Sequence, residues 1–137
     1  MKSERPTPAV TPINEGFFSL ADKGVLSLQH CTACDSRWYL PSSNCPNCPS
    51  TDLDWVEVSG QGSLWSWIVM HQPYLRAFKD EVPYVVAFVQ LREGVEIIAG
   101  LADVDPADLH IDMPLEVVFE ELGQDAVPMP FFRPVAA

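Results

Sequence analysis

The chain has 137 residues, 8 basic and 19 acidic side chains and a net charge of −11, so it can bury one hydrophobic core as one or two small domains. The acidic excess disfavours a nucleic-acid partner, because negative side chains repel the phosphate backbone. No stretch approaches the roughly 20 apolar residues of a membrane span and the N-terminus lacks a signal-peptide pattern, so we expect a soluble cytoplasmic protein with reduced thiols and no membrane partner.

The first two segments of the chain are a tail and a helix. Residues 1–11 are polar and contain prolines, and we expect them to form a flexible tail. A short helix is predicted over residues 12–22, because Thr11 and Pro12 form a typical helix start and Gly24 a typical helix end. Apolar side chains recur within this segment at helical spacing, which supports the same prediction.

All four cysteines lie within residues 31–48, as two Cys-x-x-Cys pairs with ten residues between them. Short strands are predicted at 25–31 and 38–40 beside the first pair. Two such pairs place four sulfurs around one ion at tetrahedral geometry, which is typical of a zinc ribbon. A redox dithiol needs only one pair, disulfides are rare in the cytosol, and iron is the alternative ion because it also suits four thiolates.

The sequence therefore predicts one zinc ion held by four ligands, which are Cys31, Cys34, Cys45 and Cys48. Because the protein fills all four positions, no position remains for a substrate or an activated water. The predicted role of the metal is structural.

From residue 55 onward the pattern changes to β-structure, with five predicted strands at 55–72, 84–91, 95–104, 115–122 and 131–135. Gly60 and Gly62 favour a bulge or a sharp bend in the first strand. Asp105 followed by Pro106 predicts a short helical turn between the third and fourth strands. Five strands with one helical connection at this place are typical of an OB-fold barrel.

The expected fold class is mainly β. It comprises an N-terminal helix and a zinc ribbon over residues 12–54 and a C-terminal five-stranded OB-fold barrel over residues 55–137.

The order of these motifs resembles a family of small bacterial and archaeal proteins that join a helix, a rubredoxin-like zinc ribbon and an OB-fold. The family is known as domain of unknown function thirty-five and is associated with acyl-CoA enzymes. The resemblance covers residues 12–135 and depends on the segments GVLSLQHCTAC, CPNC, SGQGSLWSW, VPYVVAFVQLREGVEIIAG, DMPLEVVFEE and FFRP. Asp35 and Pro49 stand where the family usually has a glycine after each Cys-x-x-Cys pair. Glycine gives the backbone more freedom, so we expect these two turns to differ from those of the family.

The resemblance implies an accessory subunit without catalytic residues of its own. Proteins similar to this chain pair with thiolase-superfamily enzymes, among them thiolases and lipid-transfer-protein-type retro-aldolases for steroid or other side chains. A CoA ester would then be the substrate of a hetero-oligomeric complex, and the partner would hold the reacting groups. Accessory subunits of hotdog-fold enoyl-CoA hydratases and of acetyltransferase complexes are the alternatives.

Motifs of independent catalysis are absent from the sequence, which contains no GxSxG, HExxH, Walker or GxGxxG segment. Its three histidines, His30, His71 and His110, lie outside any recognisable nucleophile motif. Since the four thiols are assigned to the metal, we expect no catalytic residue in this chain.

The segment HQPYLRAFKDEVP at 71–83 is predicted to join the first two barrel strands, where OB-folds commonly bind their partners. Its apolar side chains are expected to contact a partner protein, and its two basic side chains to approach a CoA phosphate or acidic partner groups. The expected contact residues are Tyr74, Leu75, Arg76, Phe78 and Lys79. An ordinary loop with its aromatic side chains packed on the barrel is the alternative.

Two other classes of binding protein use similar folds. A nucleic-acid module would need a basic groove beside stacking aromatics such as Trp65, Trp67 and Tyr84. Residues 55–137 carry 13 acidic and 4 basic side chains, a net of −9, and do not supply such a groove. A rubredoxin-like electron carrier would need iron, and a colourless protein would exclude it.

Overall fold

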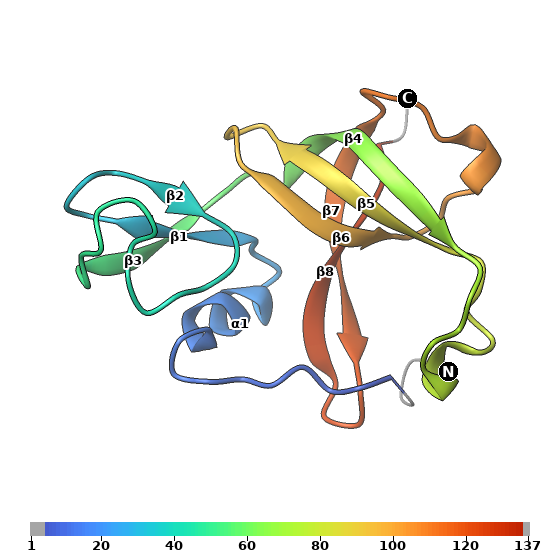
Figure 1. Ribbon diagram of the computed structural model, residues 1–137, viewed down its shortest axis with the longest axis horizontal. Coiled ribbons are helices and arrows are strands. Elements are labelled where there is room, and N and C mark those ends of the chain that lie inside the picture. The colour runs from blue at the N-terminus through green and yellow to red at the C-terminus, as the bar shows by residue number, and fades with distance from the viewer. Residues whose placement is uncertain (1–4, 136–137) are drawn as a thin grey trace.

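The structure is a computed structural model that describes residues 5–135, so residues 1–4 of the expected tail and the last two residues lie outside the described part. Figure 1 shows a small three-stranded sheet beside a closed five-stranded barrel, with helix α1 packed between them. This arrangement confirms the mainly β fold class predicted from the sequence.

Helix α1 (Glu15–Ala21) is shorter than the helix predicted over 12–22. The Thr11 carbonyl accepts hydrogen bonds from the backbone N–H groups of residues 14 and 15 at 3.1 and 2.9 Å, and Asn14 Oδ1 accepts one from Thr11 N at 2.7 Å. These bonds hold residues 12–14 in a turn, so Asn14, and not Thr11, precedes the helix. Gly24 has a φ of 77°, the left-handed conformation that closes many helix ends, as predicted.

The small sheet has the order β2-β1-β3, with β1 (Ser27–Cys31) between β2 (Arg37–Trp38) and β3 (Leu53–Glu57). The prediction of one barrel strand over 55–72 was wrong in its first part, because β3 pairs antiparallel with β1 and not with the barrel. Gly60 has a φ of 75°, a left-handed conformation that ends the extended strand. The chain changes sheets at this glycine.

The barrel closes in the order β4-β5-β6-β8-β7, and its neighbours are antiparallel except for the parallel pair β6–β8. Its strands are β4 (Gln61–Met70), β5 (Tyr84–Leu91), β6 (Glu96–Leu101), β7 (Pro114–Leu122) and β8 (Val127–Pro134). The predicted five-stranded OB-fold barrel is thereby confirmed.

Short 3₁₀ turns lie in two barrel connections, η2 (Arg76–Phe78) between β4 and β5, and η3 (Pro106–Asp108) between β6 and β7. The predicted helix start at Asp105 is confirmed, because its carboxylate accepts a hydrogen bond from Ala107 N at 2.9 Å. Within residues 5–135, no helix has both the length and the apolar character that crossing a membrane requires.

Of the bulge or sharp bend predicted at Gly60 and Gly62, the left-handed Gly60 supplies the bend, whereas the bulge of β4 lies between Leu64 and Ser66. Gly62 has a different role, because a Cβ atom at this position would lie 2.7 Å from the Gln90 carbonyl oxygen on β5. The glycine therefore permits the close pairing of these two strands.

One hydrophobic core runs through helix, ribbon and barrel. Helix α1 contributes Phe17 and Phe18, and the ribbon contributes Leu26 and Leu28, which are 1% and 0% exposed. The barrel contributes Leu64, Ala87, Val89, Leu91, Ile97, Ala99, Met113, Leu115 and Phe132. The ribbon is therefore joined to the barrel by shared packing as well as by the chain.

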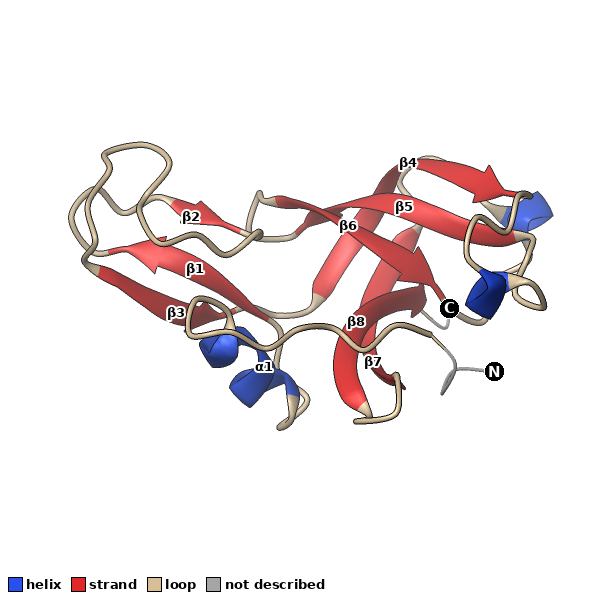
Figure 2. Ribbon diagram, turned by 60° about the horizontal axis from the view of Figure 1, so that its bottom comes forward, coloured by secondary structure: helices blue, strands red, loops and turns tan. Residues whose placement is uncertain are grey.

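Residues 5–11 run as an extended segment from α1 toward the loop at 71–83, below the barrel in Figure 1 and across the front in Figure 2. Thr7 lies against Gly123 at the turn between β7 and β8, and Arg5 forms an ion pair with Glu81. The described part of the expected tail thus contacts the barrel, and its mobility stays a prediction.

Candidate metal centre and docking loop

Two tight turns carry the cysteines. In the first, Asp35 N donates to the Cys31 carbonyl at 2.8 Å and Cys31 N donates to the Ser36 carbonyl at 2.9 Å. In the second, Cys45 N donates to the Ser50 carbonyl at 2.9 Å. Asp35 has a φ of 66°, so the first turn keeps the left-handed conformation that glycine would adopt without strain.

The four sulfur atoms of the predicted ligands lie within 4.8 Å of one another. The Sγ atoms of Cys31 and Cys48, and those of Cys34 and Cys45, are 3.5 Å apart. These separations exceed the roughly 2.05 Å of a disulfide and approach the roughly 3.8 Å edge of a tetrahedron with metal–sulfur bonds of about 2.3 Å. The cluster therefore fits one tetrahedrally coordinated ion. Among the described residues, no other group of three or more His, Cys, Asp or Glu side chains lies close enough together to hold a metal.

The environment of the thiols favours a bound cation. Hydrogen bonds with Ser36 and then Asn47 lower the pKa of Cys34 to about 5. The backbone N–H of Ser50 lowers the pKa of Cys48, but the neighbouring thiols, Cys34 first, raise it to about 12. Because like charges this close repel, four thiolates need a dication to coexist.

Amide groups around the cluster also point at sulfur. Asn47 N and Cys48 N donate to Cys45 Sγ at 3.3 and 3.4 Å, and Asn47 Nδ2 lies 3.6 Å from Cys34 Sγ. Outer contacts of this kind orient metal ligands and stabilise their charge.

His30, the residue before the first ligand, connects the first turn to β3. Its Nε2 lies 2.6 Å from Asp35 Oδ1 and its Nδ1 lies 2.7 Å from Asp54 Oδ1. Hydrogen bonds with Asp35 first and Asp54 second raise the pKa of His30, and His30 in turn lowers the pKa of Asp35. A protonated imidazole can donate to both carboxylates at once. The sequence did not indicate this role, because Asp54 reaches His30 only through strand pairing.

Gln29 fixes the segment between the two cysteine pairs and was likewise not singled out as a site residue. It is 5% exposed. Its Oε1 accepts hydrogen bonds from Trp38 Nε1 at 2.9 Å and from Ser42 N at 2.7 Å, and its Nε2 donates to the Ser42 carbonyl at 2.9 Å. A glutamine inside the apolar strand VLSLQHC was the available signal.

We call the loop at 71–83 the docking loop. Its five predicted contact residues differ in how far their side chains are exposed to solvent. Tyr74 and Leu75 are 78% and 49% exposed, and both basic side chains face solvent. The ring of Phe78 instead lies 5.6 Å from that of Tyr84 and 5.4 Å from the Arg5 guanidinium. Four of the five side chains are therefore exposed, whereas Phe78 packs against Tyr84 on the barrel.

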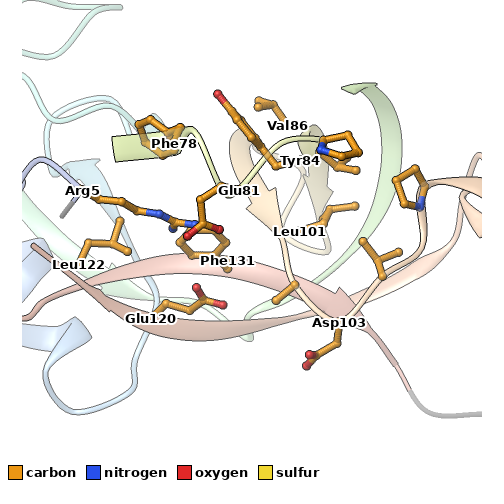
Figure 3. Close-up of a pocket in the computed structure, with 16 residues that line it drawn as sticks. Arg5, Phe78, Glu81, Tyr84, Val86, Leu101, Asp103, Glu120, Leu122 and Phe131 are labelled. Carbon is orange, nitrogen blue, oxygen red and sulfur yellow. The ribbon is translucent and has the colours of Figure 1, made fainter. Parts of the chain in front are cut away.

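A cavity of about 460 Å³ lies between the docking loop and the barrel wall. Figure 3 shows the Arg5 side chain reaching between Phe78 and Phe131 toward Glu81. The Arg5 Nη2 to Glu81 Oε2 distance is 2.8 Å, and the Arg5 side chain is 10% exposed. One end of the cavity is therefore closed by the chain's own N-terminal segment.

The remaining histidines are exposed and lie in separate loops, His71 at the start of the docking loop and His110 after η3. The Nδ1 atom of His110 lies 3.4 Å from the Asp108 carbonyl oxygen. Neither belongs to the cysteine cluster.

Comparison with known proteins follows the same division of the chain. Residues 18–54 match the family described as ChsH2, rubredoxin-like zinc ribbon domain, and residues 55–120 match ChsH2, C-terminal OB-fold domain. A solved chain described as Ltp2-ChsH2(DUF35) aldolase superposes with a TM-score of 0.81 at 36% identity, covering 94% of this chain and 99% of its own.

Two of the relatives show how much of this chain is matched. The probable enoyl-CoA hydratase alpha subunit of Thermomonospora curvata is 40% identical over 134 residues, which are 97% of this chain and 41% of that protein. This chain thus spans less than half of that relative. A DUF35 domain-containing scaffold protein of Methanothermobacter thermautotrophicus is 34% identical over 101 residues, which are 71% of this chain and 75% of that protein. With its zinc ribbon, its barrel and these relatives, the chain belongs to the DUF35 family of zinc-ribbon and OB-fold proteins.

Proposed function

We propose that this chain is a zinc-binding accessory subunit of an acyl-CoA-processing complex whose reaction is carried out by a thiolase-superfamily thiolase or retro-aldolase. The observation that carries the proposal is the match to the Ltp2-ChsH2(DUF35) aldolase chain, because it covers 99% of that chain. The description of another relative as a scaffold protein supports a non-catalytic role. The complex would be cytoplasmic, where thiols stay reduced.

Zinc is the ion assigned to the four-sulfur site. The four thiols lie close enough to surround one ion, and the matching family is a zinc ribbon. Four protein ligands close the coordination sphere, so the ion would hold the two turns together without activating water.

The docking loop would meet the partner near its CoA ester. Tyr74 and Leu75 are exposed enough to enter an interface. Arg76 and Lys79 would meet CoA phosphates or acidic groups of the partner. The chain's net charge of −11 disfavours tight CoA binding without that partner.

A second candidate is an accessory role in an enoyl-CoA hydratase. The T. curvata relative favours it at 40% identity, but the larger part of that relative lies outside the matched residues. Hydratase chemistry would therefore need a further domain or a separate subunit.

The test is to purify the tagged chain from its native host, identify the protein bound in a fixed ratio, and assay both components on acyl-CoA substrates. A thiolase-superfamily partner with activity in the complex, and no turnover by this chain alone, is the expected result. A hotdog-fold partner would instead support the second candidate. Steady turnover by the isolated chain, abolished by changing one of its own residues, would overturn the accessory role.

A further inference from the structure

The outer wall of strands β4, β5 and β6 is apolar where a barrel wall facing water is normally polar. Four large side chains project from it: Trp65, Ile68, Phe88 and Ile98 are 50%, 56%, 42% and 53% exposed. Together with the half-buried Val86 beside them, they form a surface that we call the apolar strip.

The strip is continuous across the three strands. Ile68 on β4 is paired with Val86 on β5, and Phe88 on β5 is paired with Ile98 on β6. The β4 bulge directly after Leu64 brings Trp65 to the outer face, where its ring meets that of Phe88 edge-on at 6.2 Å.

The fold itself does not require these outer residues. The inner face of the same strands already packs into the core, and closure of the barrel leaves no strand edge to protect. On β7 of the same barrel, Glu116, Val118 and Glu120 face away from the buried Leu115, so two of these three outward side chains are charged. An apolar outer face is therefore a local feature of β4–β6, and such patches mark interaction sites.

One end of the strip deepens into a groove between the ribbon and the barrel. This groove has a volume of about 560 Å³ and is lined by Trp38, Leu40, Phe88 and Ile98 among others. Leu40 is 76% exposed. Interfaces gain most of their affinity from apolar anchors that fill pockets, so the groove offers a partner a place for one large side chain.

Charge indicates what kind of partner fits. Strands β4, β5 and β6 contain a single charged side chain, Glu96, whereas residues 102–125 contain eight acidic side chains and no lysine or arginine. This acidic flank adjoins the strip at two places. At the first, Asp112 N donates to the carbonyl of Leu64, the residue before Trp65, at 2.8 Å. At the second, Asp103 lines the same cavity as Val86.

We propose that the apolar strip is the surface through which this chain binds its partner subunit, and that the partner presents apolar side chains bordered by lysine or arginine. The inference rests on the proposed function, because it needs a partner protein. A second copy of this chain fits less well, since it would bring two acidic flanks together.

The experiment uses the partner enzyme that co-purifies with the wild-type chain, expressed separately and titrated by calorimetry. Phe88→Ser and Ile98→Ser each should raise the Kd about tenfold or more, because each removes a central apolar contact. Gln90→Ser, at the next outward position of β5, is the matched control and should change the Kd by less than about twofold. Asp112→Asn should reduce the dependence of the Kd on salt concentration. Unchanged circular dichroism and metal content show that the variants fold.

The outcomes separate the two proposals. If both strip variants bind a thiolase-type partner with wild-type affinity, the apolar strip is not the binding surface, and the proposed function still stands. If these variants lose binding to a partner that does not process acyl-CoA, the apolar strip is the binding surface, but the proposed function is wrong. A wild-type dimer in sedimentation that Ile98→Ser dissociates would assign the strip to a second copy, and a monomer without any partner would overturn both.

Discussion

Arg5 and Glu81 form a 2.8 Å ion pair in which the arginine side chain is only 10% exposed. The same guanidinium lies 5.4 Å from the ring of Phe78 and 5.9 Å from that of Phe131. Arg5 thereby connects the N-terminal segment, the docking loop and β8. The docking loop thus contacts a residue that is far from it in the sequence.

Arg5→Ala should loosen the docking loop. Losing one ion pair and two cation–π contacts at a mostly buried site should cost about 1–2 kcal/mol of unfolding free energy. Limited proteolysis should then cut within residues 71–83 faster than in the wild type. Lys23→Ala, at an exposed position just after the end of α1, is the control. Equal cleavage rates in both variants would show that Arg5 does not order the loop.

Cys45→Ser should remove the metal and destabilise the whole chain. Structural zinc contributes roughly 10–16 kcal/mol of apparent binding free energy in model peptides, and here α1, the ribbon and the barrel share one core. Elemental analysis should find about one zinc per wild-type chain in a colourless protein, and heat denaturation of the variant should show a lower midpoint. Ser43→Ala, between the two cysteine pairs, should retain the metal. Wild-type protein with less than about a quarter equivalent of any metal would contradict the assignment.

Gln29→Leu should destabilise the ribbon without removing a ligand. The leucine would leave Trp38 Nε1 and both backbone groups of Ser42 without their partner, at a cost of about 2–4 kcal/mol. Denaturant unfolding measures this loss, and a chelator should extract the metal faster from the variant. Gln124→Leu, at an exposed position, should change little. Wild-type stability in Gln29→Leu would mean that water replaces these bonds without cost.

Stability should fall at alkaline pH because of Tyr39. Burial raises the pKa of its phenol to about 12, whereas an unfolded tyrosine ionises near a pKa of about 10. The folded state holds the proton more tightly, so this contribution is complete below about pH 10 and is lost as the pH rises toward 12. Between about pH 9 and pH 11, the wild type should lose about 1.4 kcal/mol more than Tyr39→Phe. Parallel pH profiles for the two proteins would refute this.

Tyr74→Ala and Phe78→Ala should separate partner contact from loop packing. Tyr74 is 78% exposed, so its removal should leave the unfolding free energy unchanged and weaken partner binding by about 1–3 kcal/mol if the docking loop lies in the interface. Phe78 packs against Tyr84 and Arg5, so its removal should lower stability as well. Calorimetric titration and thermal denaturation of both variants distinguish the two effects. Full partner affinity in Tyr74→Ala would place the loop outside the interface.

Prediction from sequence succeeded where the signal was local. The two cysteine pairs define the metal cluster by spacing alone, and alternating residues such as those of β5 define the barrel strands. Prediction failed where a segment pairs or bonds with residues that its own local pattern does not indicate. The helix start moved because Asn14 bonds back to Thr11. The first residues of the predicted barrel strand, Trp55 to Glu57, belong to the ribbon sheet because they pair with β1.

The contacts of His30 and Arg5 were beyond prediction for a related reason. The partners of His30 include Asp54 on a paired strand, and Arg5 meets Phe78, Glu81 and Phe131 only once the barrel has closed. No spacing rule in a single sequence indicates such contacts.

The core shared by ribbon and barrel limits how members of this family can be recombined. One cluster contains Phe17, Phe18 and Leu28 together with residues of the barrel strands. The connection between the two sheets is also hydrogen-bonded on both sides, because Val58 N donates to the Leu26 carbonyl and the Gly60 carbonyl accepts from Val117 N. A zinc ribbon grafted from a relative would bring side chains shaped for another barrel. Successful chimeras should therefore exchange α1, the ribbon and the barrel residues beneath them together, and natural relatives should vary these positions in step.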